Sequence, residues 1–549
     1  MATSILSIGQ SALAAAQVGI STTGHNIANA ATPGFSRQVV VQGAAQPQDY
    51  GFGFMGQGTE ISTVKRIYSE FLGSQVRTAQ TTKSGLDSYY AQIKQIDNML
   101  ADPASGLSPA LQDFFSGMQE MSSNPSSIPA RQAALSSAES LASSFQSMAA
   151  RLDEIEQGVN SQITSGVSVI NSYAKQIAQL NDAIGRAQGA SGQPANDLLD
   201  QRDQLILDLN KEIKATVVKQ GDGGYNVFIG NGQPLVVGVS AFSLTTTTLP
   251  ANPERIEVAY QTANGPVVIG ESSLGGGKLG GVLEFRSQTL EPAQQALDDL
   301  AIGLATTFND QHRLGQDLDG NLGSDFFVVP SGASDFAVAI NDPRQIAAAA
   351  PILAQATSTN SGTGAISSGN VNTPPPPDVN LQESVTITFT SATTFDVTGT
   401  GTGNPTGLAY TPGGTITYNG WSVTISGAPA GGDTFTMGPN TGGVGDNRNA
   451  LLLGALQTAN TMNGGTTTYQ GAYSQLVSQI GNKTRELDVT SSAAGNLLSE
   501  ANLSLQSESG VNLDEEATNL LRYQQAYQAA GKVMQIASEM FDVLLSLGR

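Results

Sequence analysis

Two short patterns in the sequence contain residues that could bind a cofactor or a metal ion. Gly51–Gly56 reads G-F-G-F-M-G and matches the G-x-G-x-x-G spacing by which a glycine-rich turn approaches a dinucleotide phosphate. That chemistry needs a strand directly before the glycines and a helix directly after them. Here a polar spacer precedes the pattern and the strand-like alternation Thr59–Val64 follows it. We therefore expect a flexible loop in a β region and no bound cofactor.

The second pattern, Asp317–Asn321, resembles the start of a calcium loop. The sixth position is Leu322 where the sharp turn needs Gly, and the twelfth is Val328 where a bidentate Glu is needed. We expect an Asx turn in its place. The chain has no Cys and only two His, His25 and His312, which excludes thiolate ligands and a histidine cage. His25 is expected to cap or pack near a helix end, and the sequence predicts no metal and no enzymatic activity.

The composition is that of a long, acidic chain in which only 13% of the residues are charged. Its 549 residues suffice for about three or four domains. A net charge of −21 repels phosphate backbones and no basic stripe interrupts it, so nucleic acid is not an expected partner. No membrane is expected either, because no stretch reaches the ~18–20 apolar residues that a span requires. The start of the chain lacks the pattern of a cleaved secretory signal.

The first segment is the most unusual. From Met1 to Ser36 there is no Asp, Glu, Lys or Arg. Large apolar residues recur at seven-residue spacing, and a small residue follows each of them three positions later. The large residues are Leu6, Leu13, Ile20 and Ile27, and the small ones are Gly9, Ala16, Thr23 and Ala30. This pattern predicts a helix that ends near Ala30 and packs closely on another helix. The alternative is a buried first helix of an ordinary domain.

A turn and a strand follow that helix. Thr32, Pro33 and Gly34 place Pro-Gly at the centre of a type II turn, and the proline drives Thr32 out of the helical region. The alternation in Arg37–Gln42 then predicts a strand.

The end of the chain has a second heptad pattern. Asn512 is the expected N-cap, with Glu515 completing a capping box. Large residues then recur every seven positions, at Leu513, Leu520, Tyr527, Met534 and Phe541. We predict that the two terminal helices pair as a coiled coil. Because their seam buries too little surface to offset the entropy of ordering them, we expect them to become fully ordered only beside other subunits.

The run Thr23–Arg37 reads T-G-H-N-I-A-N-A-A-T-P-G-F-S-R and resembles the N-terminal signature of the flagellar axial proteins, the family of rod, hook and hook-associated proteins. Ala31 stands where Asn is more usual in that signature. Interior stretches are similar to the hook-associated branch at the first hook–filament junction, and they are Leu198–Leu205, Asn231–Val236 and Ser509–Glu516.

This resemblance implies a secreted structural adaptor of the bacterial flagellum. It would join hook to filament and leave the cell through the flagellar type III apparatus without cleavage. The partners it implies are copies of the same chain in a helical array, the hook protein, a second junction protein of the FlgL family, and an export chaperone of the FlgN family. Alternatives are a hook or rod subunit and, from another class, a secreted enzyme with a β-rich domain.

The fold predicted between the ends is mainly α with β insertions, in nested layers built from an N-side and a C-side segment. Apolar residues at three- and four-residue steps predict a long helix that begins near Pro129, a second over 196–213 capped by Asn196, and a matching C-side stripe from Tyr469 to Leu505. Thr357–Asn380 reads as an exposed low-complexity spacer before short strands.

The predicted domains are discontinuous. Residues 1–65 with 505–549 are expected to form a terminal helical polymerisation domain. Residues 66–330 with 445–504 are expected to form a bundle of long helices with a β-hairpin region near 215–280, and residues 331–444 a small all-β outer domain. The alternative is a series of independent domains.

Overall fold

The computed structural model describes residues 2–100, 102, 106–221, 223–372, 374–399, 401 and 403–547. The chain divides into two compact units, each assembled from segments distant in sequence. The first unit contains Met1–Ile93, Gln157–Ser287 and Thr484–Arg549, and the second contains Lys94–Glu156 and Gln288–Lys483. The predicted fold class, mainly α with β insertions and segments nested within one another, is confirmed.

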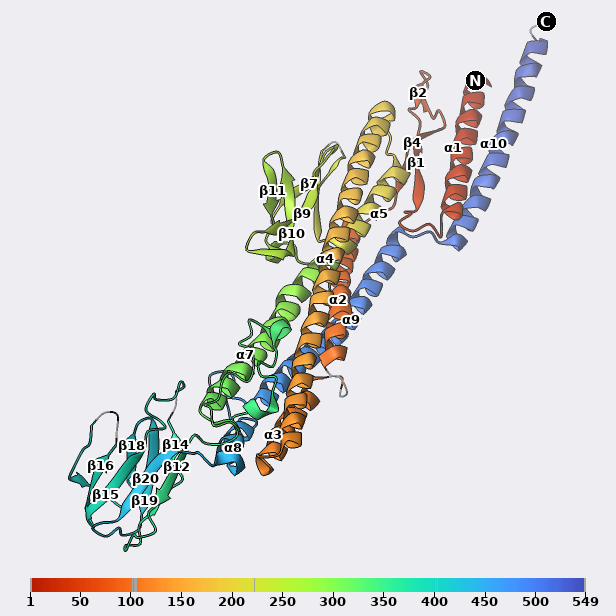
Figure 1. Cartoon of the computed structure of the whole chain (residues 1–549). Helices are drawn as coiled ribbons and strands as arrows, with labels where there is room; N and C mark the ends of the chain where they lie inside the picture. The colour runs from red at the N-terminus through yellow and green to blue at the C-terminus, as the bar shows by residue number, and fades with distance from the viewer. Residues whose placement is uncertain are drawn as a thin grey trace. The chain divides into compact units, whose positions relative to one another are not determined.

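The first unit is built on long helices. They are α1 (Ala2–Ala28), most of α2 (Glu70–Leu100), the second part of α4 (Ile128–Ser191), α5 (Asn196–Glu212), α6 (Gly277–Phe285), the end of α9 (Tyr469–Ser509) and α10 (Leu513–Leu547). Figure 1 shows α1 beside α10. The stretch of α4 in this unit buries Val159, Ile163, Val167, Ile170 and Ile177 at steps of three, four and seven residues, which places one continuous apolar face toward the core.

Small antiparallel sheets complete the first unit. β1 (Gln38–Ala44) pairs with β4 (Thr59–Arg66), and β2 (Gln48–Asp49) pairs with β3 (Phe54–Met55). After α5, the predicted hairpin region forms two sheets. One contains β5 (Ala215–Lys219), β6 (Tyr225–Ile229), β7 (Gln233–Val237) and β8 (Ser240–Ala241), and the other β9 (Leu244–Leu249), β10 (Asn252–Thr262) and β11 (Gly265–Val268).

The helical part of the second unit surrounds an aromatic core. It contains α3 (Leu107–Ser123), the first part of α4, α7 (Glu291–Arg313), α8 (Arg448–Ala455) and the start of α9. Phe308 of α7 lies 5.2 Å from Phe114 and 4.9 Å from Phe326, measured between ring centroids. His312 is fully buried beside them, and Ser324 O and the backbone N–H of Ala347 hold its two ring nitrogens.

The β part of the second unit has its own core around Trp421, Phe389 and Phe435. One sheet has the order β12 (Ile352–Ala356), β20 (Thr434–Pro439), β15 (Val385–Ser391), β16 (Thr394–Thr398) and β17 (Leu408–Ala409). The other pairs β19 (Trp421–Ser426) with β13 (Ala365–Ile366), β14 (Asn370–Val371) and β18 (Thr415–Tyr418). The prediction of a structureless spacer over 357–380 is therefore wrong in part, because β13 and β14 from this stretch complete the second sheet.

The prediction that no stretch of the chain is long and apolar enough to span a membrane is wrong for one helix. Over Ile5–Ala28, α1 is long and apolar enough to span a membrane by length and composition alone. That prediction rested on uninterrupted apolar runs, whereas the mean hydropathy of α1 stays high because Ser, Thr and Gly lower it only slightly and the helix has no Asp, Glu, Lys or Arg. Length and composition do not distinguish a membrane span from a helix packed against protein, and α1 packs against α10.

Candidate functional site: the terminal helix pair and its turn

On α1, the contact with α10 is made mainly by small residues. The buried residues in the described part of α1 are Gly9, Ala15, Ala16, Gly19, Thr23 and Asn26, and those of α10 are Glu516, Ala530 and Ala537. A Cβ at Gly9 would lie 2.9 Å from Met534 Sδ, and one at Gly19 would lie 2.5 Å from the ring of Tyr523. The side chains of Met534 and Tyr523 therefore lie directly on the backbone of α1, in space that a side chain at either glycine would fill.

The large residues of both heptad patterns lie beside this contact. Leu6, Leu13 and Ile20 are half-buried, as are Leu520 and Met534, whereas the more exposed members are Ile27, Leu513, Tyr527 and Phe541. Of the small residues in the predicted pattern, Gly9, Ala16 and Thr23 are buried, whereas Ala30 is exposed and lies beyond the end of α1. Whether the nine large residues contact other subunits stays a prediction.

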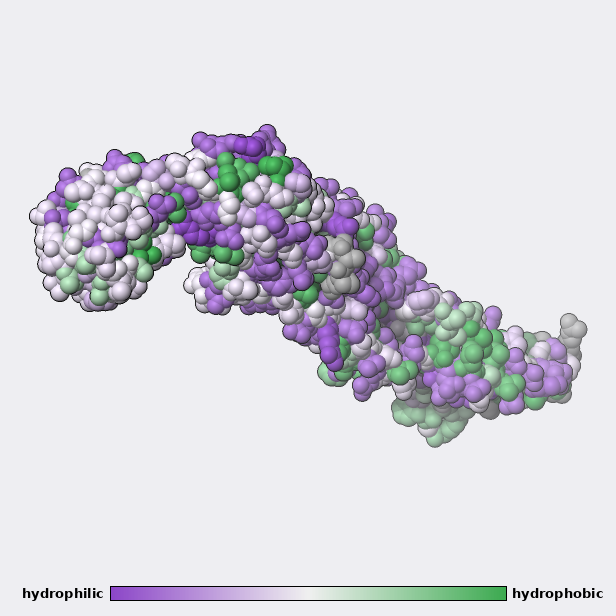
Figure 2. Space-filling model, turned by 60° about the horizontal axis from the view of Figure 1, so that its bottom comes forward, coloured by the Kyte–Doolittle hydropathy of each residue, from purple (hydrophilic) through white to green (hydrophobic). Residues whose placement is uncertain are grey.

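Both helices leave apolar surface uncovered within one chain. On α10, the exposed apolar residues outside the heptad pattern are Leu521, Val533, Ile536, Met540 and Val543. Figure 2 shows hydrophobic surface, in green, gathered over the part of the molecule that carries the chain ends. Large contiguous apolar patches on a protein surface usually mark an interaction site.

The turn after α1 has the predicted geometry. The N–H of Phe35 donates to Thr32 O at 3.2 Å, and Gly34 has φ +77°, as the third residue of a type II turn requires. Thr32, Pro33 and Gly34 are all exposed. A Cβ at Gly34 would lie 2.7 Å from Gln204 Oε1, which is the end of a flexible side chain, so the positive φ is what requires glycine here.

A buried polar network ties this turn to the start of α10. Asn26 Nδ2 donates to Gln38 O at 2.8 Å and to Glu516 Oε2 at 3.1 Å, while Asn26 Oδ1 accepts from Gln38 N at 3.0 Å. Arg37 Nε donates to Glu516 Oε1 at 2.8 Å, and Arg37 Nη1 donates to Glu515 Oε2 at 2.7 Å. The end of α1, the start of β1 and the first turn of α10 are thus fixed to one another.

A second buried cluster ties the turn to α5. Asp200 accepts from the N–H of Ser36 at 2.9 Å, from Ser36 Oγ at 2.8 Å and from Arg66 Nη1 at 2.6 Å, while Arg66 Nη2 lies 2.7 Å from Asp203 Oδ2. Burial raises the pKa of the Asp200 carboxyl, although Ser36 and Arg66 oppose that shift. Burial alone would lower the pKa of Arg66, but Asp203 and Asp200 raise it above its ordinary value. Both groups are held as an ion pair with hydrogen bonds from several sides.

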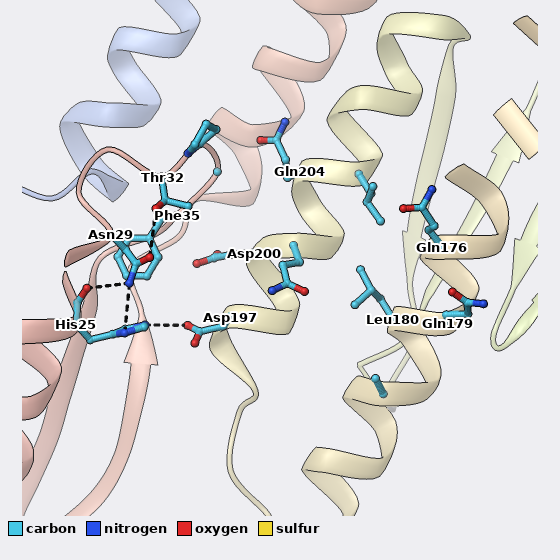
Figure 3. A pocket seen from close by; sticks show the side chains of 15 residues that line it. His25, Asn29, Thr32, Phe35, Gln176, Gln179, Leu180, Asp197, Asp200 and Gln204 are labelled. Atoms are coloured by element: carbon cyan, nitrogen blue, oxygen red, sulfur yellow. Dashed lines mark hydrogen bonds and ion pairs between the residues drawn. The ribbon is translucent and has the colours of Figure 1, made fainter. Parts of the chain in front are cut away.

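His25 lies between these clusters at the end of α1. Its Nε2 is 3.2 Å from Asp197 Oδ1, and its Nδ1 is 3.3 Å from Asn29 Nδ2 (Figure 3). The ring of His25 meets that of Phe35 edge-on, with the centroids 5.4 Å apart. The prediction that His25 packs near a helix end is confirmed, and the fold supplies a carboxylate that the local sequence lacks.

A groove opens beside the turn, and we call it the signature groove. It has a volume of about 650 Å³ and lies between the residues that follow α1, one face of α4 and one face of α5 (Figure 3). Its half-buried apolar side chains are Phe35, Leu180 and Leu205, and its amide side chains are Gln176, Gln179, Gln201 and Gln204.

Sequence reasoning missed the charged residues that organise the site. Arg37, Arg66, Asp200 and Glu516 belong to neither heptad pattern, and their partners lie far away in the sequence. The signal in the sequence was that Arg37, Asp200 and Glu516 fall inside the stretches that carried the family resemblance.

Two capping predictions also change. Asn196 does not cap α5 but donates to Val64 O at 2.8 Å, and Glu515 pairs with Arg37, whereas Asn512 Oδ1 does accept from Asp514 N at 3.0 Å.

The two candidate ligand sites do not form. Gly51–Gly56 lies in the β2–β3 hairpin, with no helix after it. Asp317 Oδ1 accepts from the N–H of Asp319 at 2.9 Å, which is the predicted Asx turn. Across the described residues, no group of three or more His, Cys, Asp or Glu side chains is placed to hold a metal ion.

Comparisons of the two chain ends define the class of protein. Residues 6–35 match the family described as flagella basal body rod protein, and residues 505–547 match the C-terminal family of the flagellar basal body rod FlgEFG proteins. The ends that pair in the structure are therefore those of a flagellar axial protein.

The rest of the chain specifies the family. Residues 93–327 match the helical domain of the flagellar hook-associated protein FlgK. The chain is 36% identical to flagellar hook-associated protein 1 of Escherichia coli and 36% identical to that of Salmonella typhimurium, covering 99% of this chain and 100% of each relative. The solved flagellar hook junction protein FlgK from Burkholderia pseudomallei superimposes with a TM-score of 0.72 at 31% identity, over 79% of this chain and 99% of that one. The chain belongs to the family of flagellar hook-associated protein 1, FlgK. It is a structural component of the flagellum at the hook junction, and its relatives are not enzymes.

Proposed function

We propose that this chain is the adaptor subunit that joins hook to filament, and that it enters the helical array through α1 and α10. The observation that carries the proposal is a helix pair that is closed on one side by small residues and left apolar on the others. Burying an exposed apolar side chain contributes roughly 1.5–3 kcal/mol, and α10 alone leaves more than half of Leu513, Leu521, Ile536 and Val543 exposed. In a helical array, one surface of each subunit meets a different surface of the next.

The partners we propose are copies of this chain, the hook protein on one side and a second junction protein of the FlgL family on the other. The apolar face of α10 would be covered before assembly by an export chaperone of the FlgN family, and the chain would leave the cell through the flagellar type III apparatus. The nine heptad residues from Leu6 to Phe541 are the proposed interface, and residues 1–65 with 505–549 the proposed polymerisation domain.

The test places charges on the exposed face of α10. Tyr527→Lys and Ile536→Lys change residues that are 40% and 55% exposed, so the isolated chain should melt as the wild type does. We expect at least a tenfold loss of this protein from isolated flagella, with unpolymerised filament protein shed into the medium. The matched control is Val267→Lys, an exposed valine of β11 outside the terminal helices. Wild-type incorporation of both α10 variants contradicts the proposal.

A second measurement addresses the isolated subunit. Because both helices bury few residues within one chain, we expect the amides of α1 and α10 to exchange hydrogen faster than those of α4 in dilute monomer, and to slow at least a hundredfold in assembled flagella. Strong protection of both terminal helices in the monomer would show that assembly does not order them.

A further inference from the structure

The β2–β3 hairpin carries aromatic side chains that nothing in the described chain covers. We call Gln48–Met55 the aromatic finger. Phe52 is 81% exposed and Phe54 is 74% exposed, and the ring of Tyr50 lies 6.1 Å from that of Phe52. β2 and β3 pair with each other and join no other sheet. Two exposed phenylalanines at the tip of a projecting hairpin are unfavourable in water unless a partner buries them.

The segment that follows the finger is fixed to α1. The N–H of Thr59 donates to Ser11 Oγ of α1 at 3.2 Å, and a Cβ at Gly58 would overlap the same hydroxyl. At the tip, the N–H of Tyr50 donates to Gly53 O at 3.1 Å and closes the loop. Any subunit that packs on the first half of α1 therefore lies next to the finger.

The charge distribution favours contact between copies at this place. The chain carries a net charge of −21, so two copies repel each other over most of their surface. Between Arg37 and Glu60, however, Asp49 is the single charged residue, and its carboxylate accepts from the N–H of Gly51 at 2.8 Å. The finger can approach an acidic neighbour at little electrostatic cost.

The signature groove has the complementary chemistry. Its volume of about 650 Å³ lies in the range of pockets that enclose small ligands, and it suffices for two aromatic rings. Phe35, Leu180 and Leu205 offer apolar contacts, and the glutamine amides around them bring no charge. Both carboxylates in its lining are already bound, Asp200 by Ser36 and Arg66, and Asp197 by Gln38.

A finger does not reach the groove of its own chain. The segment that follows the finger is anchored at Ser11 and the groove begins at His25, and these two residues are roughly 21 Å apart along the helix axis. Figure 1 shows β2 beside the N-terminal end of α1, whereas the chain enters the turn at the other end of that helix. A projection and a recess at opposite ends of one helix are what a head-to-tail contact requires.

We propose that the aromatic finger of one copy inserts into the signature groove of the next copy of this chain in the array. This inference rests on the proposed assembly through α1 and α10. It adds to that assembly a specific side-chain contact that sets the offset between neighbouring copies. The hook protein as the finger's partner is the competing outcome of the test.

The absence of native cysteines permits a direct test by crosslinking. A Phe52→Cys/Gln201→Cys chain is expressed in place of the wild type, and isolated flagella are oxidised. A ladder of dimers and higher oligomers of this chain is expected, because each copy supplies a finger to one neighbour and a groove to the other. The matched control, Phe52→Cys/Val267→Cys, pairs the same finger cysteine with an exposed position on β11 and should remain monomeric. If the double-cysteine chain is incorporated but gives no ladder, the proposal is overturned. The proposal is also overturned if a Phe52→Cys chain crosslinks to a cysteine placed in the hook protein.

Incorporation and crosslinking are read from the same particles, which separates this inference from the proposed function. Incorporated but uncrosslinked chain refutes the finger contact alone, while the α10 lysine variants test assembly itself. A further variant, Phe52→Ala/Phe54→Ala, removes the rings from exposed positions and should leave the melting temperature unchanged. We expect at least a fivefold loss of this variant from flagella, and wild-type incorporation would count against the proposal.

Discussion

At the residue scale, the site is organised by a few buried charges whose partners are far away in the sequence. Arg37 joins the turn after α1 to both glutamates at the start of α10, yet the two contacts differ in environment. The Glu516 side chain is 2% exposed and that of Glu515 is 57% exposed. Their contributions to stability should therefore differ, since solvent screens an exposed pair.

The first prediction compares the two glutamates. Glu516→Gln leaves a buried partner of Arg37 uncharged and weakens the bond from Asn26, so we expect the opening free energy of β1 amides to fall by about 2 kcal/mol. Hydrogen exchange measures it. Glu515→Gln is the matched control, with an expected change below about 0.5 kcal/mol. Equal effects of the two substitutions would show that the burial of Glu516 adds nothing.

The second prediction concerns acid. Burial lowers the pKa of His312 from 6.5 to about 4, although Ser324 O opposes the shift. Below pH 6.5 the imidazole of His312 binds a proton in the unfolded chain but not in the folded chain. The contribution of neutral His312 to folding stability is therefore fully present above pH 6.5 and is lost as pH falls toward 4. The free energy of unfolding falls by about 3 kcal/mol over this range.

Thermal melting of the second unit at pH 7 and pH 4.5 measures this fall. A His312→Gln variant should be less stable at pH 7 and lose less on acidification, and a wild type equally stable at both values contradicts the assignment.

At the element scale, α1 depends on glycine where α10 passes over it. In an exposed helix, Gly→Ala stabilises by about 1 kcal/mol. At Gly19 the added Cβ would overlap the ring of Tyr523, whereas at Gly24 no atom lies within 4 Å. The same substitution should therefore have opposite signs at two places on one helix.

The third prediction follows from that comparison. Gly19→Ala should raise the hydrogen exchange rates of α10 amides in the monomer by about fivefold or more, because it separates the two helices. Gly24→Ala should leave them unchanged or lower them slightly. Slower exchange in both variants would mean that Tyr523 moves aside without cost.

Helix and strand positions could be predicted because their periodicity is local. The α4 stripe, the β5–β7 hairpin and both terminal helices follow directly from the spacing of apolar residues. The small members of the α1 heptad pattern, Gly9, Ala16 and Thr23, are buried, as close helix packing predicts, whereas Gly19, under the ring of Tyr523, lies outside that pattern and was not predicted. The Asp200 cluster was beyond reach, because its members come from three separate segments. The strands β13 and β14 were missed because their short, polar sequence pairs only in the presence of β19.

At the scale of the whole molecule, the β part of the second unit begins and ends at one place. Ile352 of β12 pairs with Pro439 of β20, and the N–H of Asn440 donates to Pro351 O at 3.1 Å. Its buried hydrophobic residues form one cluster between Ile352 and Met437, with Trp421 fully buried. The connections to the helical part therefore leave side by side, as in a domain inserted into a loop.

The fourth prediction removes this part. A chain in which a short Gly-Ser linker replaces residues 353–438 should keep its helical content and its incorporation into flagella within about twofold of the wild type. The excised segment, expressed alone, should fold with a β-type circular dichroism spectrum. Loss of incorporation by a folded deletion chain would assign the β part to assembly. We propose that the outer domain predicted at 331–444 is this inserted module.

The pairing of α1 with α10 has a consequence for the order of folding. Because a chain is synthesised from its N-terminus, α1 is complete long before α10 exists, and α1 finds its intramolecular partner only in the last helix. A chain that stalls or is cut short before α10 therefore cannot form this helix pair.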